Sequence, residues 1–95
     1  MTERKVTIER EELNGANEFV LRIDGEKFGF LEFTRPEVGV MRIEYVEVSP
    51  DLRGTGLGQQ LVEKAVAFAK ETKLRVVPIC SYARAVMERT GSLVQ

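Results

Sequence analysis

The residues best suited to bind a ligand are three glycines at alternate positions, Gly54, Gly56 and Gly58. They follow a predicted strand that ends at Val48, and a predicted amphipathic helix begins among them. Glycines leave consecutive backbone N–H groups uncovered, the positive end of the helix dipole points at the same place, and Arg53 adds a full positive charge. This combination favours a diphosphate site. An ordinary strand-to-helix turn rarely needs three glycines that weaken the first helical turn.

Two common phosphate-binding motifs do not fit this loop. A Walker P-loop requires a lysine followed by serine or threonine after its last glycine, and no lysine follows Gly58. A Rossmann fingerprint has the spacing G-x-G-x-x-G after the first strand of a parallel unit. Here the spacing is G-x-G-x-G, and four predicted strands precede it.

Composition indicates one folded domain over residues 1–95. The chain is 43% hydrophobic with a net charge of −1, which disfavours a general nucleic-acid binder. No segment reads as a membrane span or a signal peptide. The single cysteine, Cys80, cannot form an internal disulfide, so we expect a cytoplasmic protein. The chain has no histidine, so a general base must be a carboxylate, a tyrosine, a lysine, the thiol or a bound water, and no metal is expected.

Four predicted strands come before the glycines and must position them. The first helix begins among the glycines, and a strand and a second helix follow it. Alternation and turn residues predict strands over Val6–Arg10, Phe19–Ile23, Phe28–Phe33 and Val40–Val48. Asn14-Gly15 and Asp24-Gly25 are hairpin signals, because both residues of each pair tolerate positive φ.

The second half changes to a helical period. Apolar residues from Leu57 to Ala69 predict an amphipathic helix, and Leu74–Val77 is a short apolar strand. Ser81 is the predicted N-cap of a last helix, Tyr82–Arg89, which Gly91 ends. The predicted order is β-β-β-β-α-β-α, a mixed α/β fold with a largely antiparallel sheet and one βαβ crossover. In such a crossover the ligand binds beyond the carboxyl end of the strand, where the glycine loop lies.

The segment Arg53-Gly54-Thr55-Gly56-Leu57-Gly58 resembles the R/Q-x-x-G-x-G/A signature of the GNAT superfamily of acyl-CoA-dependent N-acyltransferases. Val48, Pro50 and the order of elements agree with that family. The segment Val77-Pro78-Ile79-Cys80-Ser81-Tyr82 resembles the "v-P-x-C-x-Y" segment of its compact, YjdJ-like branch. The resemblance covers nearly the whole chain, from Val6 to Arg89.

The resemblance implies acetyl-CoA, or another acyl-CoA, as co-substrate. The residues it assigns to the co-substrate lie in two runs. Backbone amides from Arg53 through Gly54, Thr55, Gly56 and Leu57 to Gly58 would hold the diphosphate. The pantetheine arm would pair, as an added strand, with the end of the fourth strand, which includes Tyr45, Val46 and Val48.

Two departures from the family pattern concern the acceptor and the base. Larger members place one or two helices between the first two strands, and Glu11–Asn17 is too short for them. Compact members often carry a histidine three residues before the valine that opens the loop, and that position is Tyr45 here. A role for that histidine as base therefore cannot be transferred to this chain.

Two residues near the last helix are candidate proton donors. Cys80 precedes a helix N-terminus, where a thiolate is favoured, so it is either an acyl-accepting nucleophile or a donor to the departing CoA thiolate. The alternative is a small buried hydrophobe, as most free cysteines are. Tyr82 occupies the helix on which many GNAT enzymes carry the tyrosine that protonates the CoA sulfur. Its alternative is an aromatic plug between helix and sheet.

Carboxylates of the fourth strand are candidate bases. Alternation places Tyr45 and Glu47 on one face of the strand and Glu44 on the other, unless a β-bulge intervenes. Glu47 is the candidate that takes a proton from the acceptor. The alternative is a solvated face, or an ion pair with Arg42.

The predicted function is acetyl transfer from acetyl-CoA to an amine by direct attack, with backbone N–H groups of the fourth strand polarising the thioester carbonyl. A non-enzymatic acyl-CoA-binding module or sensor is the alternative, favoured by the missing acceptor helices and histidine. A third interpretation is a partner-binding domain that has lost its ligand, and the intact glycine loop disfavours it.

Overall fold

Two tight hairpins build the first three strands of the sheet. In the computed structural model, which describes residues 4–93, Asn14 and Gly15 have φ of 54° and 81°, and Asp24 and Gly25 have φ of 52° and 87°. Positive φ at both central residues is the type I′ geometry that matches strand twist. The elements are β1 (Val6–Leu13), β2 (Ala16–Ile23), β3 (Glu26–Thr34), β4 (Val40–Val48), η1 (Pro50–Leu52), α1 (Leu57–Glu71), β5 (Arg75–Pro78) and α2 (Ser81–Thr90).

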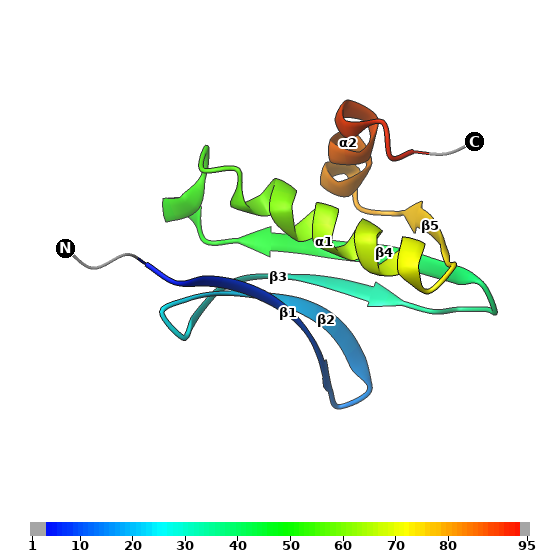
Figure 1. Cartoon of the computed structure of the whole chain (residues 1–95), viewed down its shortest axis with the longest axis horizontal. Coiled ribbons are helices and arrows are strands. Elements are labelled where there is room, and N and C mark those ends of the chain that lie inside the picture. Colours follow the sequence, from blue (N-terminus) through cyan, green and yellow to red (C-terminus); the bar gives the residue numbers. More distant parts are fainter. Residues whose placement is uncertain (1–3, 94–95) are drawn as a thin grey trace.

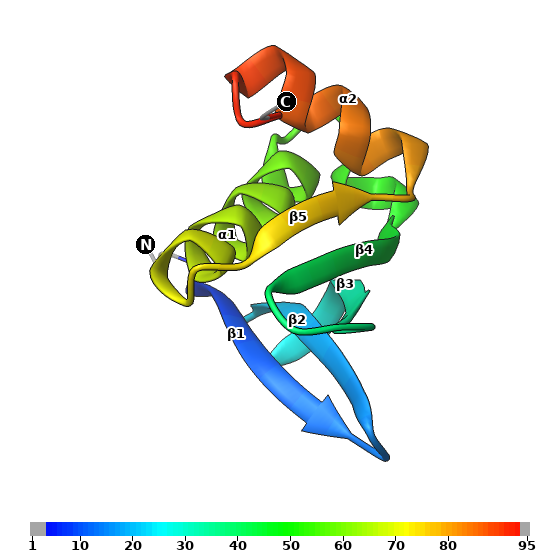
Figure 2. The ribbon, with the colours of Figure 1, turned by 90° about the vertical axis from the view of Figure 1, so that its right-hand side faces the viewer.

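The five strands form one sheet in the order β1-β2-β3-β4-β5. Neighbours β1 to β4 are antiparallel, and β4 and β5 are parallel. Helix α1 makes the crossover between β4 and β5, running along the sheet in Figure 1. Figure 2 shows α2 at the end of the sheet formed by β4 and β5. The predicted β-β-β-β-α-β-α order and mixed α/β class are confirmed.

The hydrophobic core lies between α1 and the sheet face that it covers. One cluster joins the apolar stripe of α1, the inner face of α2 and alternate strand residues, including Leu31, Phe33 and Ile43, each at most 1% exposed. The rings of Phe19, Phe33 and Phe68 pack against one another in tilted and edge-on arrangements, with centroids 5.6 to 5.9 Å apart. Burying such side chains contributes about 1.5–3 kcal/mol each, so this layer fixes the position of α1 on the sheet.

The opposite face of the sheet, called the far face below, carries charged and aromatic side chains. Phe30 and Glu32 lie on it because they alternate with the core residues Leu31 and Phe33. Three ion pairs cross strands or lie along them: Arg22–Glu11, Lys27–Glu18 and Arg42–Glu44. Exposed pairs of this kind contribute about 0–1 kcal/mol each.

Several predicted boundaries need correction. Strand β1 extends to Leu13, beyond the predicted Arg10, and β3 begins at Glu26, before the predicted Phe28. In a hairpin with a two-residue turn, the residues on either side of the turn are already paired with each other, so both strands extend as far as the turn. Strand β5 begins at Arg75 because the N–H of Leu74 instead donates to Ala69 O (2.7 Å) at the end of α1.

The last helix also begins differently from the prediction. Ser81 is its first residue, and Cys80 is the N-cap, with no side-chain capping hydrogen bond. Gly91 ends the helix at φ 73°, as predicted. Within residues 4–93, neither helix combines the length and apolar character that a membrane crossing requires.

Candidate functional site

The loop between β4 and α1 is built by one short 3₁₀ turn and two left-handed glycines. Pro50 begins η1, and Arg53 returns to extended backbone at φ −63° and ψ 138°. Gly54 and Gly56 then adopt φ of 81° and 82°. A side chain at such angles is strained, so glycine is required at both positions. Gly56 is the N-cap of α1 and offers no side-chain acceptor to the first helical turn.

Hydrogen bonds inside the loop use the amides of the non-glycine residues. The N–H of Arg53 donates to Pro50 O at 3.2 Å, and the N–H of Thr55 donates to Leu52 O at 3.2 Å. The N–H of Leu57 donates to Thr55 Oγ1 at 3.3 Å, and that hydroxyl itself donates to Leu52 O at 2.6 Å. Every second amide of the signature is therefore already occupied.

The glycine amides are the ones left over. Within residues 4–93, the N–H groups of Gly54, Gly56, Gly58 and Gln59 have no hydrogen-bond acceptor. The last two belong to the first turn of α1, whose N–H groups have no partner inside the helix and lie at the positive end of its dipole. The loop thus presents a set of donors suited to an anion.

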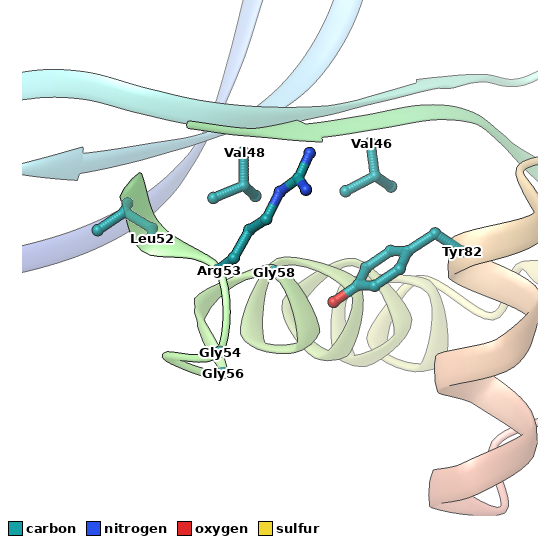
Figure 3. A pocket seen from close by; sticks show the side chains of 8 residues that line it. All are labelled: Val46, Val48, Leu52, Arg53, Gly54, Gly56, Gly58 and Tyr82. Atoms are coloured by element: carbon teal, nitrogen blue, oxygen red, sulfur yellow. The ribbon is translucent and has the colours of Figure 1, made fainter. Parts of the chain in front are cut away.

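A cavity of about 240 Å³ opens beside these amides. It is lined by Val46, Val48, Leu52, Arg53, Gly54, Gly56, Gly58 and Tyr82. Figure 3 shows the Arg53 side chain reaching from the loop toward β4, and the Tyr82 ring directing its hydroxyl toward the loop. The cavity combines apolar walls from β4 with a guanidinium and free amides at its loop end.

Tyr82 depends on the absence of a side chain at Gly58. A Cβ added to Gly58 would lie 2.7 Å from the Tyr82 hydroxyl oxygen and 3.3 Å from Cζ. Gly58 therefore admits the phenol to the start of α1, although its φ is that of an ordinary helix. Tyr82 lines the cavity and remains 42% exposed.

Strands β4 and β5 separate beside this cavity. Their parallel pairing runs only from Val40↔Arg75 to Ile43↔Pro78, and the last contacts are N–H donations from Ile79 and Cys80 to Ile43 O at 3.0 and 3.2 Å. Beyond this point β4 continues to Val48 with one edge unpaired by β5. The open space between the two strands is called the split below.

Backbone groups of β4 alternate between β3 and the split. The N–H of Ser49 donates to Phe28 O at 2.8 Å, so Glu47 and Tyr45 also direct their backbone groups to β3. The same alternation turns the N–H and C=O groups of Val46 and Val48 toward the split. Of the three residues predicted to pair with an extended ligand, these two have the required orientation.

A β-bulge in β4 changes the predicted faces. The register passes from Phe33↔Ile43 to Glu32↔Tyr45, which leaves Glu44 as the extra residue. The far face therefore carries Glu44 as well as Tyr45, and the simple alternation that separated the two is wrong. Glu44 accepts hydrogen bonds from Arg42 Nε (2.6 Å) and Thr34 Oγ1 (2.8 Å). These bonds, that from Arg42 first, lower the pKa of Glu44.

Tyr45 and Glu47 form a pair on the far face. The Tyr45 hydroxyl donates to Glu47 Oε1 at 3.1 Å, and the Tyr45 ring packs on Phe30 with centroids 5.8 Å apart. The hydrogen bond and the charge of Glu47 raise the pKa of Tyr45 above its ordinary value. Glu47 does not line the glycine-loop cavity.

Cys80 lies at the closed end of the split. Its side chain is partly buried against the core, and its carbonyl accepts the N–H of Arg84 at 3.0 Å in the first turn of α2. In residues 4–93 no group of three histidine, cysteine or acidic side chains is arranged to hold a metal ion.

The structure gathers most, but not all, of the predicted residues. Seven of them line the cavity: Val46, Val48, Arg53, Gly54, Gly56, Gly58 and Tyr82. Thr55 and Leu57 shape the loop from within, and Tyr45, Glu47 and Cys80 lie outside the cavity. Sequence reasoning missed Leu52 as a wall and Gln59 as a donor. Counting the first helical N–H groups from Gly56 would have found Gln59.

Comparison with known proteins identifies relatives of this chain. A family model described as GCN5-related N-acetyl-transferase matches residues 18–95. An uncharacterized N-acetyltransferase of Archaeoglobus fulgidus is 37% identical over 68 residues, a match that covers 63% of this chain and 45% of the relative. The matched region thus spans less than half of that curated relative's length.

Solved structures share the fold at low sequence identity. The IAA acetyltransferase from Bacillus cereus has a TM-score of 0.72 at 18% identity, with 90% of this chain and 75% of that chain covered. An aminoglycoside N-acetyltransferase in complex with CoA has a TM-score of 0.73 at 14% identity, with 99% and 91% covered. The arrangement of strands and helices is therefore common to all three chains.

Proposed function

The chain belongs to the GCN5-related N-acetyltransferase family, and we propose that it binds acetyl-CoA at the glycine loop and transfers the acetyl group to an amine. The observation that carries this proposal is the alternation of amides in the loop. Amides of Arg53, Thr55 and Leu57 are used internally, while those of the three glycines have no acceptor in residues 4–93. We assign the CoA diphosphate to the free amides, with Arg53 neutralising part of its charge.

The pantetheine arm is proposed to follow the open edge of β4. Val46 and Val48 direct backbone donors and acceptors into the split, and their side chains line the cavity that leads there. An arm with two amides would add to this edge as an extra strand. The thioester would then lie between the ends of β4 and β5, with its carbonyl polarised by a β4 N–H group.

The chemical step is direct attack of a neutral amine on the thioester carbon, which forms a C–N bond and breaks the C–S bond. Tyr82 and Cys80 are the two candidate donors to the departing thiolate. Tyr82 has the better position toward the cavity, which it lines. Glu47 is the proposed final acceptor of the amine proton.

We propose that residues 1–95 act as one acyl-CoA-binding domain of the compact, YjdJ-like branch, in the cytoplasm. The branch assignment rests on the Val77–Tyr82 segment, and the location on the single unpaired cysteine. An acyl-CoA-binding module without transfer is the second candidate. The two-residue connection between β1 and β2 favours it, because no helix there covers an acceptor.

Calorimetric titration with acetyl-CoA tests the binding site. Gly56→Ala puts a Cβ on a left-handed residue, at a strain of roughly 1–2 kcal/mol, and should turn the loop amides away from the ligand. We expect the affinity to fall at least about tenfold, the equivalent of about 1.4 kcal/mol. Gly25→Ala is the matched control, since Gly25 has φ 87° and equally open surroundings in the β2–β3 turn. It should leave the affinity unchanged.

Two results decide between the candidates. A folded Gly56→Ala variant with wild-type affinity would refute the assigned site. If acetyl-CoA binds, release of the CoA thiol is followed with a thiol reagent in the presence of spermidine, tyramine or a lysine-containing peptide. Release that depends on the amine supports the transferase, and binding without release supports the module.

A further inference from the structure

Tyr45 occupies the entrance to the split from the far face. It is the first residue of β4 after the bulge, two positions beyond the Ile43 carbonyl that holds the end of β5. Tyr45 is 50% exposed, and its ring packs against Phe30. Its hydroxyl donates to Glu47 Oε1 at 3.1 Å. The Glu47 carboxylate, two residues farther along β4, thus holds a solvent-facing phenol beside the split.

A thioester in the split would be open to both faces of the sheet, because no strand fills that space. On the α1 side lies the cavity lined by the glycine loop and Tyr82, and the CoA itself would occupy that cavity. An acceptor therefore has free access from the far face, past Tyr45. Glu47 lies farther along β4 from the closed end of the split than Tyr45 does. Tyr45 therefore lies between Glu47 and the end of β5.

We propose that the Tyr45 hydroxyl is a catalytic relay that takes the proton of the acceptor amine and passes its own proton to Glu47. This inference rests on the proposed acetyltransferase function. It assigns a role to the Tyr45 side chain, whereas the family resemblance placed Tyr45 on the strand that pairs with pantetheine and transferred no role to it from the histidine that compact members often carry at this position.

The relay balances without any further reactant. A protonated amine in contact with Tyr45 Oη gives that oxygen one proton, while the phenol's own proton moves to Glu47 Oε1. The amine becomes neutral, the phenol is unchanged, and the carboxylate becomes a carboxylic acid. The neutral amine then attacks the thioester as described above, and Glu47 later returns its proton to water.

The charges around Tyr45 suit this role. Glu47 on the same strand accepts the hydrogen bond of the phenol, whereas Glu32, directly opposite on β3, forms no hydrogen bond with it in residues 4–93. Lys27 on β3 places its Nζ 4.8 Å from the centroid of the Phe30 ring, which supports the Tyr45 ring. The raised pKa of Tyr45 keeps the phenol protonated at neutral pH, so it remains the donor to Glu47.

Steady-state kinetics with the fastest amine of the panel above test the relay. Tyr45→Phe keeps the ring on Phe30 and removes only the hydroxyl, and Glu47→Gln removes the proton acceptor. Loss of general base catalysis typically costs about 10²–10⁴ in rate, so we expect kcat near pH 7 to fall at least about 100-fold in both, with KM for acetyl-CoA unchanged. Glu32→Gln is the matched control: it removes a charge from the same face and should keep the wild-type kcat.

The pH dependence separates a relay from a structural role. Since the relay serves to deprotonate an ammonium, the defect of both variants should shrink as pH rises toward the amine's own pKa, about 10 for a lysine side chain. A constant defect across pH, an equal loss in Glu32→Gln, or wild-type kcat in Tyr45→Phe would each overturn the relay. If the wild-type chain binds acetyl-CoA but acetylates no amine, the transferase proposal fails and the relay fails with it.

A spectroscopic measurement tests the hydrogen bond without reference to activity. In a Tyr82→Phe background Tyr45 is the sole tyrosine of the chain, so tyrosinate absorbance reports its ionisation alone. Adding Glu47→Gln should lower the pKa of Tyr45, whereas adding Glu32→Gln should move it less. An unchanged pKa after Glu47→Gln would show that the pair does not form in solution and would overturn the relay even if the enzyme is active.

Discussion

The three glycines of the loop are required for different physical reasons. Gly54 and Gly56 have left-handed backbone angles, and nothing lies within 4 Å of the place where their Cβ atoms would be. Gly58 has helical angles, but its missing side chain makes room for Tyr82. The sequence alone indicates that all three serve close approach of a ligand. The structure adds that the last one also serves close approach of a protein side chain.

The contact between Gly58 and Tyr82 predicts non-additive stability. Alanine is more favourable than glycine inside a helix by about 1 kcal/mol, but here the new Cβ would displace the phenol. We expect Gly58→Ala to bring little gain in the wild type and a gain of up to about 1 kcal/mol in a Tyr82→Phe background. Urea unfolding of the four proteins in this double-mutant cycle measures the coupling. Equal effects of Gly58→Ala in both backgrounds would contradict the contact.

At the scale of elements, one hydroxyl joins the two ends of the loop, in addition to the backbone hydrogen bonds within it. Thr55 Oγ1 donates to Leu52 O and accepts from Leu57 N, so it joins η1 to the first turn of α1. This arrangement replaces the side-chain cap that Gly56 cannot supply. A threonine in a glycine-rich loop gives no sequence signal of that role, because its partner groups are backbone atoms.

Removing that hydroxyl is expected to loosen the start of α1. Loss of an N-terminal capping hydroxyl costs about 0.5–2 kcal/mol, so Thr55→Ala should lower the free energy of unfolding by about 1 kcal/mol. Thr55→Ser keeps the oxygen and should stay within a few tenths of a kcal/mol of the wild type. Chemical denaturation of both variants makes the comparison. If serine and alanine have the same effect, the hydroxyl does not hold the loop.

The fourth strand shows where prediction from sequence ends. Its bounds, Val40–Val48, agree with the β-branched pattern. The face of each of its side chains does not follow from the pattern, because the bulge at Glu44 is set by pairing with β3. A single extra residue moves Tyr45 and Glu47 relative to Glu44, and pairing between distant strands is not written in the local sequence.

At the scale of the whole molecule, local signals predicted the order of the elements and long-range contacts decided the site. Both hairpins followed from their Asn-Gly and Asp-Gly turns, and the glycine loop followed from its spacing. The split did not, because it depends on β5 ending at Pro78 while β4 continues to Val48. The position of Tyr82 over α1 likewise depends on the packing of two helices that are separated by a strand.

The far face makes the fold sensitive to acid. Hydrogen bonds from Arg22 to Glu11 and from Arg42 to Glu44 are the largest causes that lower the pKa of each carboxyl below 4.5. A lowered folded-state pKa contributes stability that is complete above the unfolded value and is lost as pH falls through the folded one. The loss should therefore begin below about pH 4.5, the usual carboxyl range.

Denaturation at neutral and acidic pH checks this expectation. The drop in urea midpoint between about pH 7 and pH 3 should be smaller in the double variant Glu11→Gln, Glu44→Gln than in the wild type, since both ionised carboxylates are then absent at every pH. Glu12→Gln with Glu32→Gln removes the same charge from carboxylates that form no ion pair within residues 4–93. This control should keep most of the wild-type drop. Equal drops in the two double variants would mean that acid acts through overall charge, and that the guanidinium partners contribute no specific stability.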